Sequence, residues 1–344
     1  MSAIDSGFRY HAYGLRVHAS RALEGLVEAT GRCQLEIRFE PSPPSTAAAD
    51  FGDHHPSASA TSWYRHDGVA WFRVRDGREI VVWAEPGADP SLVWLSLLGP
   101  AMGLALHQRG RFLLHASAVA IDGEAVVFVG PNGAGKSSVA AGLLARGHRL
   151  LSDDLTVVDT DDARPAVVPS FPFAKLWPDS ARMAAIDPAS LPRLHPEIEK
   201  RGYRPRGRFA RTPCRLARIY LLRRGDEVAQ VATMPTTAGF RTLLRHFYGA
   251  RYGVEFLRSL DGRAHFERVA RLTAAVPVRE LARPDWHRCG KSFAASIERA
   301  VIADLSAEPR PGAAPAETTT HGGRPAVSTG PSAPATAMVP RQPS

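Results

Sequence analysis

The sequence has very few cysteines. Cys33, Cys214 and Cys289 are the only three in 344 residues. They lie far apart and are odd in number, so they form neither a disulfide framework nor the spacing of a metal site. This usage favours a reducing, cytoplasmic setting, where thiols stay free.

Long uninterrupted apolar runs are also missing. Residues 1–30 carry polar and charged side chains throughout, unlike a signal peptide. The most apolar run, residues 91–106, is interrupted by Gly99, Pro100 and Gly103. At that length it favours a buried helix over a membrane span. We therefore expect no association with a membrane.

Lysine is scarce, yet the chain is basic. It has 43 Lys plus Arg against 34 Asp plus Glu, a net charge of +9, and arginine supplies most of the excess. A basic chain suits an anionic nucleotide or an acidic partner. We expect no specific nucleic-acid partner, and the sequence leaves a homo-oligomer open. An apolar fraction of 44% is enough for a sizeable core.

The chain divides into three parts. Residues 1–88 predict a small β-rich domain: 8–17 and 35–39 alternate like strands, and Asp67-Gly68 and Asp76-Gly77 separate the strands of a three-stranded meander. Residues 89–305 predict the catalytic domain. Residues 306–344 contain few large apolar side chains and are expected to be a disordered tail.

Within the catalytic part the expected elements alternate between strands and helices. The expected strands are 111–121, 124–129, 149–151 and 155–159, and a tight turn at Asp122-Gly123 joins the first two. Further elements are expected at 171–185, 216–222, 240–246 and 254–269, and a terminal helix at 286–304. This pattern predicts an α/β fold.

A glycine-rich segment after residues 124–129 fits the phosphate-loop template. Glycines permit positive φ and close backbone approach, so successive N–H groups can point inward at an anion. Lys136 begins a helix and can reach the β and γ phosphates of ATP, while the Ser137 hydroxyl can ligate Mg²⁺. The expected nucleotide-binding residues are Gly130, Pro131, Asn132, Gly133, Ala134, Gly135, Lys136, Ser137 and Ser138.

Two carboxylates follow at short distance, with Asp153 only 17 residues beyond Lys136 and Asp154 next to it. This spacing differs from most phosphate-loop proteins and indicates a kinase that phosphorylates a hydroxyl. One carboxylate would orient or deprotonate that hydroxyl, and the other would hold Mg²⁺. Adjacent strand residues point to opposite sides, so the pattern leaves the assignment open.

These features resemble the C-terminal catalytic domain of bacterial HPr kinase/phosphorylase, roughly over residues 111–160. The resemblance rests on His115, Asp122-Gly123, residues 130–138, residues 147–150 and Ser152-Asp153-Asp154. Residues 10–15 also resemble the start of HPr-kinase-like proteins found beside peptide-modification systems, including lasso-peptide tailoring kinases. The glycine-rich signature that follows the Asp pair in HPr kinases is absent, so the resemblance extends neither to HPr as substrate nor to the phosphorylase reaction.

The resemblance implies an HPr-kinase/PEP-carboxykinase-like P-loop core. It implies a serine kinase that uses ATP and Mg²⁺ on a peptide or protein with a Ser or Thr acceptor. It also implies roles: Asp153 as the base, Asp154 with Ser137 at the metal, and His115 near the phosphates beside Lys136.

Other residues and other functions stay open. Lys175 could bind a phosphate or a peptide carboxylate, or simply lie on the surface, and the arginine cluster of residues 201–211 could close on phosphate or be solvated. An ABC-type ATPase is disfavoured because its Leu-Ser-Gly-Gly signature is missing. A small-molecule kinase, an ATP-dependent PEP-carboxykinase-like enzyme and a non-catalytic nucleotide-binding regulator remain alternatives.

Overall fold

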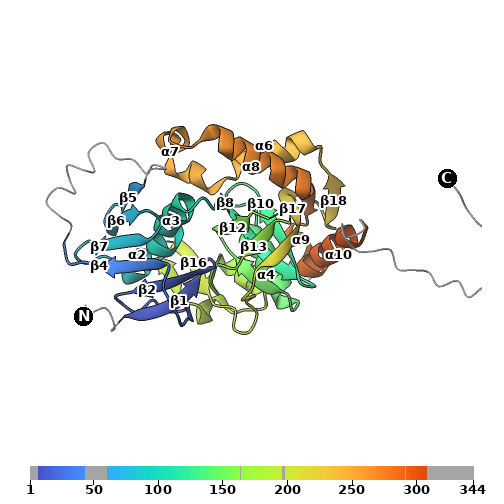
Figure 1. Cartoon of the computed structure of the whole chain (residues 1–344). Helices are drawn as coiled ribbons and strands as arrows, with labels where there is room; N and C mark the ends of the chain where they lie inside the picture. The colour runs from blue at the N-terminus through green and yellow to red at the C-terminus, as the bar shows by residue number, and fades with distance from the viewer. Residues whose placement is uncertain (1–6, 43–59, 163, 196–197, 291, 308–344) are drawn as a thin grey trace, which may run out of the picture. The chain divides into compact units, whose positions relative to one another are not determined.

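The structure is a computed structural model that describes residues 7–42, 60–162, 164–195, 198–290 and 292–307 (Figure 1). It is a mixed α/β fold with several sheets, as the sequence predicts. Contacts group the described residues up to Ala307 into one compact unit. The predicted boundary at residue 88 stays a prediction, and the predicted tail lies outside the described residues beyond Ala307.

The N-terminal part forms a seven-stranded sheet of order β3-β1-β2-β4-β7-β6-β5. Its strands are β1 (Phe8–Ala12), β2 (Leu15–Ala19), β3 (Val27–Glu28), β4 (Leu35–Phe39), β5 (Thr61–His66), β6 (Ala70–Arg75) and β7 (Glu79–Ala84). The antiparallel β5-β6-β7 meander is confirmed. Gly68 in one turn, and Asp76 and Gly77 in the other, have the positive φ that such short hairpin turns require.

The single strand expected over residues 8–17 is wrong, because Tyr13 (φ 54°) and Gly14 (φ 74°) turn the chain into the β1–β2 hairpin. This turn packs against the C-terminal part. The Tyr13 N–H donates to the Ser170 carbonyl at 3.0 Å, and its hydroxyl donates to the Leu98 carbonyl at 2.8 Å. A Cβ on Gly14 would lie 2.7 Å from Val168, so glycine also permits this close approach.

The apolar run forms one continuous helical stretch against the N-terminal sheet: α2 (Pro90–Ser96), the π-turn η1 (Leu97–Ala101) and α3 (Met102–Gln108). Pro100 lacks an N–H, and the wider π-turn accommodates it without breaking the helix. Among the described residues, this is the one helix long and apolar enough to cross a membrane by length and composition. Most of its apolar window, 61%, is buried inside the protein.

The C-terminal part is built on a nine-stranded sheet around the long strand β17 (Cys214–Arg224). β17 runs parallel to both β10 (Glu124–Val129) and β19 (Val278–Arg283). The other strands are β8 (Phe112–Leu114), β9 (Ala116–Ile121), β11 (Arg149–Ser152), β12 (Thr156–Asp159), β13 (Ala166–Val168) and β18 (Gln230–Thr233). The β9–β10 hairpin that leads into the phosphate loop is confirmed.

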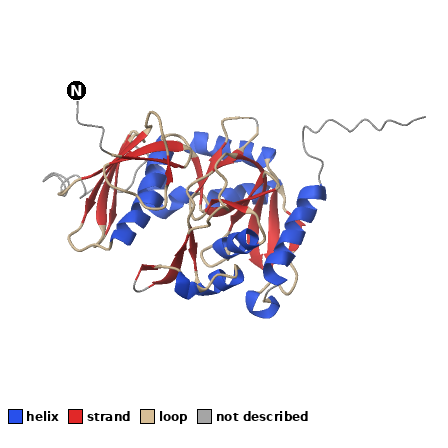
Figure 2. Cartoon of the chain, turned by 90° about the horizontal axis from the view of Figure 1, so that it is seen from below, coloured by secondary structure: helices blue, strands red, loops and turns tan. Residues whose placement is uncertain are grey.

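Helices cover this sheet, and a small third sheet lies beside it (Figure 2). The third sheet has the order β14 (Ala174–Leu176), β16 (Ile198–Tyr203), β15 (Arg193–His195). The helices are α4 (Lys136–Ala145), α5 (Pro178–Met183), η2 (Pro188–Ser190), α6 (Thr236–Arg245), η3 (Tyr248–Tyr252), α7 (Val254–Arg258), α8 (Gly262–Ala275), α9 (Trp286–Cys289) and α10 (Ser292–Ala307).

Four expected elements of this part are divided in the structure, and the one over 171–185 becomes β14 and α5. The strand over 111–121 becomes β8 and β9, which pair with different neighbours on either side of His115. The element over 254–269 becomes α7 and α8, separated by residues 259–261. The terminal helix becomes α9 and α10, because Gly290 (φ 48°) breaks it. Apolar spacing continues across the interruptions at His115, residues 259–261 and Gly290, which is why the sequence did not reveal them.

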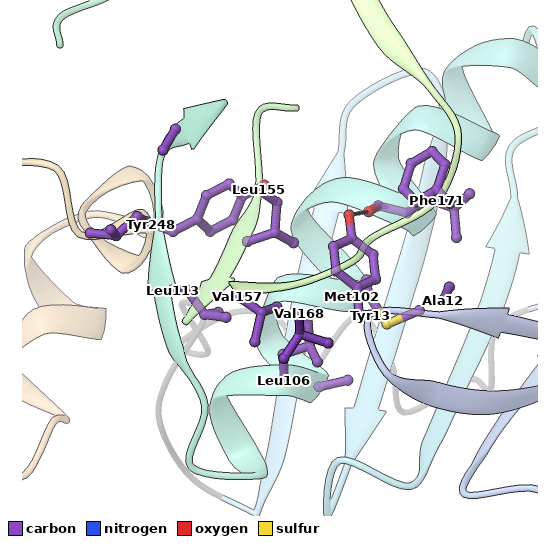
Figure 3. Close-up of a cluster of buried hydrophobic side chains, with 14 of the residues drawn as sticks. Ala12, Tyr13, Met102, Leu106, Leu113, Leu155, Val157, Val168, Phe171 and Tyr248 are labelled. Carbon is purple, nitrogen blue, oxygen red and sulfur yellow. Dashed lines mark hydrogen bonds between the residues drawn. The ribbon is translucent and has the colours of Figure 1, made fainter. Parts of the chain in front are cut away.

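The main hydrophobic cluster joins the seven-stranded N-terminal sheet to the nine-stranded sheet. Figure 3 shows Tyr13 beside Met102 and Phe171, with Val168 and Val157 nearby. A second cluster lies around α4 and α10 and includes Phe128, Leu143 and Ile297. The phosphate loop, between β10 and α4, is therefore anchored by packed elements at both ends.

Candidate active site

The segment 130–138 connects β10 to α4 as a compact loop. Gly133 (φ 80°) and Gly135 (φ 93°) take left-handed conformations that disfavour other residues. The buried Lys136 ammonium donates to the carbonyls of Gly130 at 2.9 Å and Pro131 at 3.2 Å. The Lys136 side chain thus folds back across the loop that precedes it, where an anion could replace the carbonyls as its partner.

The environment of Lys136 is unusual for a lysine. Burial lowers its pKa, and nearby Lys200 and Arg251 act in the same direction, whereas Asp153 and Asp154 oppose the change. A partly desolvated ammonium interacts more strongly with an anion than one in water. The loop also receives an outside support, because the Arg283 guanidinium donates to the Ala134 carbonyl at 2.7 Å.

Asp153 lies directly beside the loop. Its Oδ1 accepts from the Ser117 hydroxyl at 2.6 Å and from the Ser137 hydroxyl at 2.8 Å. Its Oδ2 accepts from the Lys175 backbone N–H at 2.8 Å. The carboxylate is therefore buried, fixed from three sides, and in contact with the loop serine that was predicted to bind the metal.

Asp154 points into a different set of partners. Its φ of 71° is a left-handed conformation, uncommon for a residue with a Cβ. This conformation separates the two neighbouring carboxylates. One Asp154 oxygen lies 3.2 Å from His115 Nε2, and the other lies 2.8 Å from Lys175 Nζ and 3.6 Å from an Arg251 nitrogen.

These cations keep Asp154 ionised. Burial alone would raise the pKa of its carboxyl, but Lys175, the hydrogen bond from His115, and Arg251 together hold that pKa well below its usual value. Asp154 therefore carries its negative charge throughout the physiological pH range.

His115 and its surroundings complete this side of the site. The His115 backbone N–H donates to the His246 carbonyl at 2.8 Å. Burial, followed by the charges of Lys136 and His115, lowers the pKa of the His246 ring to about 4. The Arg251 guanidinium lies 4.6 Å from the Tyr248 ring, which orients it toward Asp154.

The structure brings together most of the residues predicted from the sequence: His115, Lys136, Ser137, Asp153 and Asp154. It also places Lys175 at the site, on the third sheet. Ser138 is directed elsewhere, since its hydroxyl lies 2.6 Å from the Ser180 hydroxyl on α5. Pro131 and Asn132 are exposed at the tip of the loop.

The arginine cluster of residues 201–211 is dispersed. Arg201 donates to the Pro188 carbonyl, Arg204 to the Glu24 carbonyl, and Arg208 to the Leu144 carbonyl. Their side chains thus hold three separate backbone segments, and none of these three bonds reaches the Asp pair.

Four residues at the site carried no sequence signal: Ser117, His246, Arg251 and Arg283. Ser117 is one small residue in a buried strand, and the three others are a histidine and two arginines in a chain rich in arginine. No spacing rule connects them to the phosphate loop. Long-range strand pairing and packing bring them there.

The donor set fits Mg²⁺ bound together with a nucleotide. Among the described residues there is no group of three or more His, Cys, Asp or Glu side chains that could hold a metal. Mg²⁺ usually takes only one or two protein oxygens beside substrate phosphates and waters. Ser137 Oγ and Asp153 Oδ1, hydrogen-bonded to each other at the phosphate loop, form such a pair.

Comparisons with known proteins give a distant likeness. No family model matches the chain, and no curated relative matches it. The structure is similar to that of the Hpr(Ser) kinase/phosphatase from Coxiella burnetii, with a TM-score of 0.29 and 12% sequence identity. The match covers 57% of this chain and 97% of the other. A TM-score this low establishes neither a shared fold nor a shared activity.

Proposed function

We propose that this protein is a kinase that transfers the γ-phosphoryl group of ATP to a Ser or Thr hydroxyl of a peptide or protein. The observation that carries the proposal is the Ser137–Asp153 hydrogen bond at a phosphate loop, with Asp154 beside it among three cationic or basic groups. This combination provides a metal pair, a phosphate cradle and a second carboxylate for the acceptor.

The loop residues bind and orient the nucleotide. Backbone N–H groups around Gly133 and Gly135, together with the Lys136 ammonium, would hold the phosphates. Asp153 and Ser137 would hold Mg²⁺, which neutralises phosphate charge when it is bound. Ser117 and the Lys175 N–H fix the Asp153 carboxylate in place.

Asp154 is then the carboxylate available to the acceptor. We assign it to orienting the hydroxyl and accepting its hydrogen bond, and we assign Asp153 to the metal. This reverses the assignment that the family resemblance implies. Phosphoryl transfer passes through a loose transition state that depends more on positioning and charge than on strong base catalysis, so an ionised carboxylate of low pKa suits this role.

Lys175 and Arg251 neutralise Asp154 in the structure and carry the charge needed near a transferring phosphoryl group. Cations positioned where charge develops stabilise a transition state most effectively in a site that excludes water. His115 shares Asp154 with them and limits how that carboxylate can turn.

The N-terminal sheet approaches this side of the site. Burial raises the pKa of Tyr64 on β5, and the charge of nearby Arg251 opposes the change. Burial, Tyr248 and the two site carboxylates raise the pKa of Tyr13. Two tyrosines of the N-terminal part thus lie within electrostatic range of Arg251, Asp153 and Asp154.

The test is phosphoryl transfer from radiolabelled ATP to peptides and proteins encoded near this gene, followed by phosphoamino-acid analysis. We expect phosphoserine or phosphothreonine. Asp154→Asn should retain ATP affinity and lose about 10²-fold in transfer rate, a loss typical of a misplaced reactant. Asp159→Asn, on β12 and paired with Arg111, is the matched control and should behave like the parent.

Two results would contradict the proposal. A product that contains only a phosphorylated metabolite would indicate a small-molecule kinase. A protein that binds ATP but transfers phosphate to no acceptor would be a nucleotide-binding regulator.

A further inference from the structure

We propose that a basic groove on the N-terminal sheet binds a carboxylate-rich segment of the peptide substrate, apart from the residue that is phosphorylated. The inference rests on the proposed function in one respect, since it takes the substrate to be a peptide. The basic groove is a cavity of about 600 Å³ on the sheet face opposite the core. Its charged lining residues are Arg9, Arg16, Arg32, Arg78, Arg109 and Glu36.

Strand alternation places these side chains together. On β1, β2 and β4 the core-facing positions are buried, and the intervening positions, including Arg9, Arg16 and Glu36, point to the other face. Arg78 comes from the β6–β7 turn and Arg109 from the end of α3. Five guanidinium groups from distant parts of the sequence thus surround one cavity.

The groove differs from the rest of the same face in its charge pairing. Next to it, Arg38, Arg73 and Arg75 all contact the single carboxylate of Glu79. Within the described part of the chain, Arg16, Arg32, Arg78 and Arg109 make no ion pair. Glu36 is the one carboxylate among the residues that line the groove. The sheet therefore neutralises its neighbouring arginines but leaves the groove strongly positive.

Some of these groups are already held in position. Arg16 Nε donates to the Arg32 carbonyl at 2.8 Å, and Arg109 donates to the Gly77 carbonyl at 3.0 Å. Burial, then the charges of Arg111 and Arg78, lower the pKa of Arg109. Held cations that repel one another bind an anion at a smaller entropic cost, and the anion relieves their repulsion.

The shape and composition of the groove favour carboxylates on a peptide. His18 is the one aromatic side chain among its lining residues, and no Phe, Tyr or Trp ring lines it, so it offers little stacking surface for bases. Arg9 also lines a second, adjoining cavity of about 350 Å³ along the β1–β3 edge, whose other lining residues are Gly7, Phe8, Tyr10, Glu28 and Ala29. A sheet edge accepts an extended peptide, and arginine forks match carboxylate geometry.

The experiment measures binding without nucleotide. A fluorescein-labelled oligoglutamate peptide is titrated with the protein and followed by fluorescence anisotropy. Arg16→Ala combined with Arg78→Ala should weaken binding about tenfold or more, or about 1.4 kcal/mol. Arg263→Ala combined with Arg271→Ala, two exposed arginines of α8, removes the same charge and should leave binding unchanged. Thermal unfolding of each variant verifies that it is folded.

A change of opposite sign strengthens the test. Glu36→Gln removes the carboxylate that repels the probe and should tighten binding, whereas Glu267→Gln on α8 should not. Lys136→Ala should bind the probe like the parent, so loss of nucleotide chemistry would leave the groove's role intact. Equal binding by the Arg16/Arg78 double variant and the parent would overturn the proposal. So would a single-stranded oligonucleotide that binds more tightly through the same two arginines.

Discussion

Ser117→Ala is the substitution that tests the proposed metal pair most directly. Ser117 is fully buried on β9, and its hydroxyl donates a 2.6 Å hydrogen bond to Asp153 Oδ1, the same oxygen that Ser137 contacts. The variant removes one of three donors that fix this carboxylate. It leaves the phosphate loop and Lys136 unchanged, so Ser117 acts as a positioning residue.

The expected magnitude follows from the geometry. A hydrogen bond to a charged acceptor contributes about 1.5–3 kcal/mol, and the short distance is typical of O–H···O⁻ pairs. Asp153 keeps its bonds from Ser137 and the Lys175 N–H, so we expect the lower end, about 1.5 kcal/mol. That corresponds to roughly a tenfold loss in the Mg²⁺ enhancement of ATP binding, which the oriented Asp153 carboxylate supports.

The assay compares ATP affinity with Mg²⁺ and with EDTA, and it needs no acceptor. Affinity in EDTA depends on the loop and Lys136 and should stay as in the parent. The enhancement by Mg²⁺ should fall about tenfold in Ser117→Ala. Chemical denaturation of the same variant should show about 1.5 kcal/mol of lost stability.

Ser296→Ala is the matched control. Ser296, on α10, is also buried, and its hydroxyl accepts one hydrogen bond from the Ala229 N–H at 2.8 Å. This variant should lose similar stability and keep the full Mg²⁺ enhancement. If Ser117→Ala also keeps the full enhancement, Asp153 does not hold the metal and the assignment is wrong.

Four further predictions follow from other parts of the structure. Lys136→Ala should weaken ATP binding both with and without Mg²⁺, and unchanged calorimetric affinity would contradict the role of the loop. Lys175→Met should lower the phosphoryl-transfer rate more than ATP affinity, because the ammonium contacts Asp154, and equal losses in both would refute this. Burial, His265 and Arg268 lower the pKa of His107 to about 4. Below the ordinary histidine pKa of about 6.5, the unfolded chain binds a proton at His107 that the folded chain does not bind. The free energy of unfolding should therefore fall by up to about 3 kcal/mol as the pH is lowered from about 6.5 to about 4. Chemical denaturation of His107→Gln should show a smaller loss of stability over the same pH range, by the same amount. Truncation after Ala307 should leave the unfolding midpoint and nucleotide binding unchanged, and a lower midpoint would show that the tail stabilises the fold.

Several features could be predicted from the sequence because their causes are local. The Asp-Gly turns predicted the meander and the β9–β10 hairpin, since only certain residues take positive φ in a two-residue turn. The glycine-rich loop of residues 130–138 likewise depends on a short segment of fixed spacing, and its role in binding phosphate stays a prediction. The apolar run around Pro100 predicted a buried helix, although not the π-turn that accommodates the proline.

The sequence did not predict where a strand is interrupted by a turn. Tyr13 and Gly14 form a turn that packs on Val168, and a pattern of alternating apolar residues does not show where a turn replaces a strand residue. His115 similarly lies between two strands, β8 and β9. In both places the tertiary partners, Ser170 for Tyr13 and His246 for His115, provide the hydrogen bonds that make the interruption stable.

The sequence by itself determined the glycine-rich loop before the helix at Lys136 and the pair Asp153-Asp154. Only the tertiary structure decided how the two carboxylates differ. The left-handed backbone of Asp154 separates the two side chains, so that Asp153 meets Ser117 and Ser137 while Asp154 meets Lys175 and Arg251. Neither Ser117 nor Arg251 is near the pair in sequence. Their positions follow from the pairing of β9 with β11 and from the packing of η3 on β8, which are long-range interactions that no local spacing encodes.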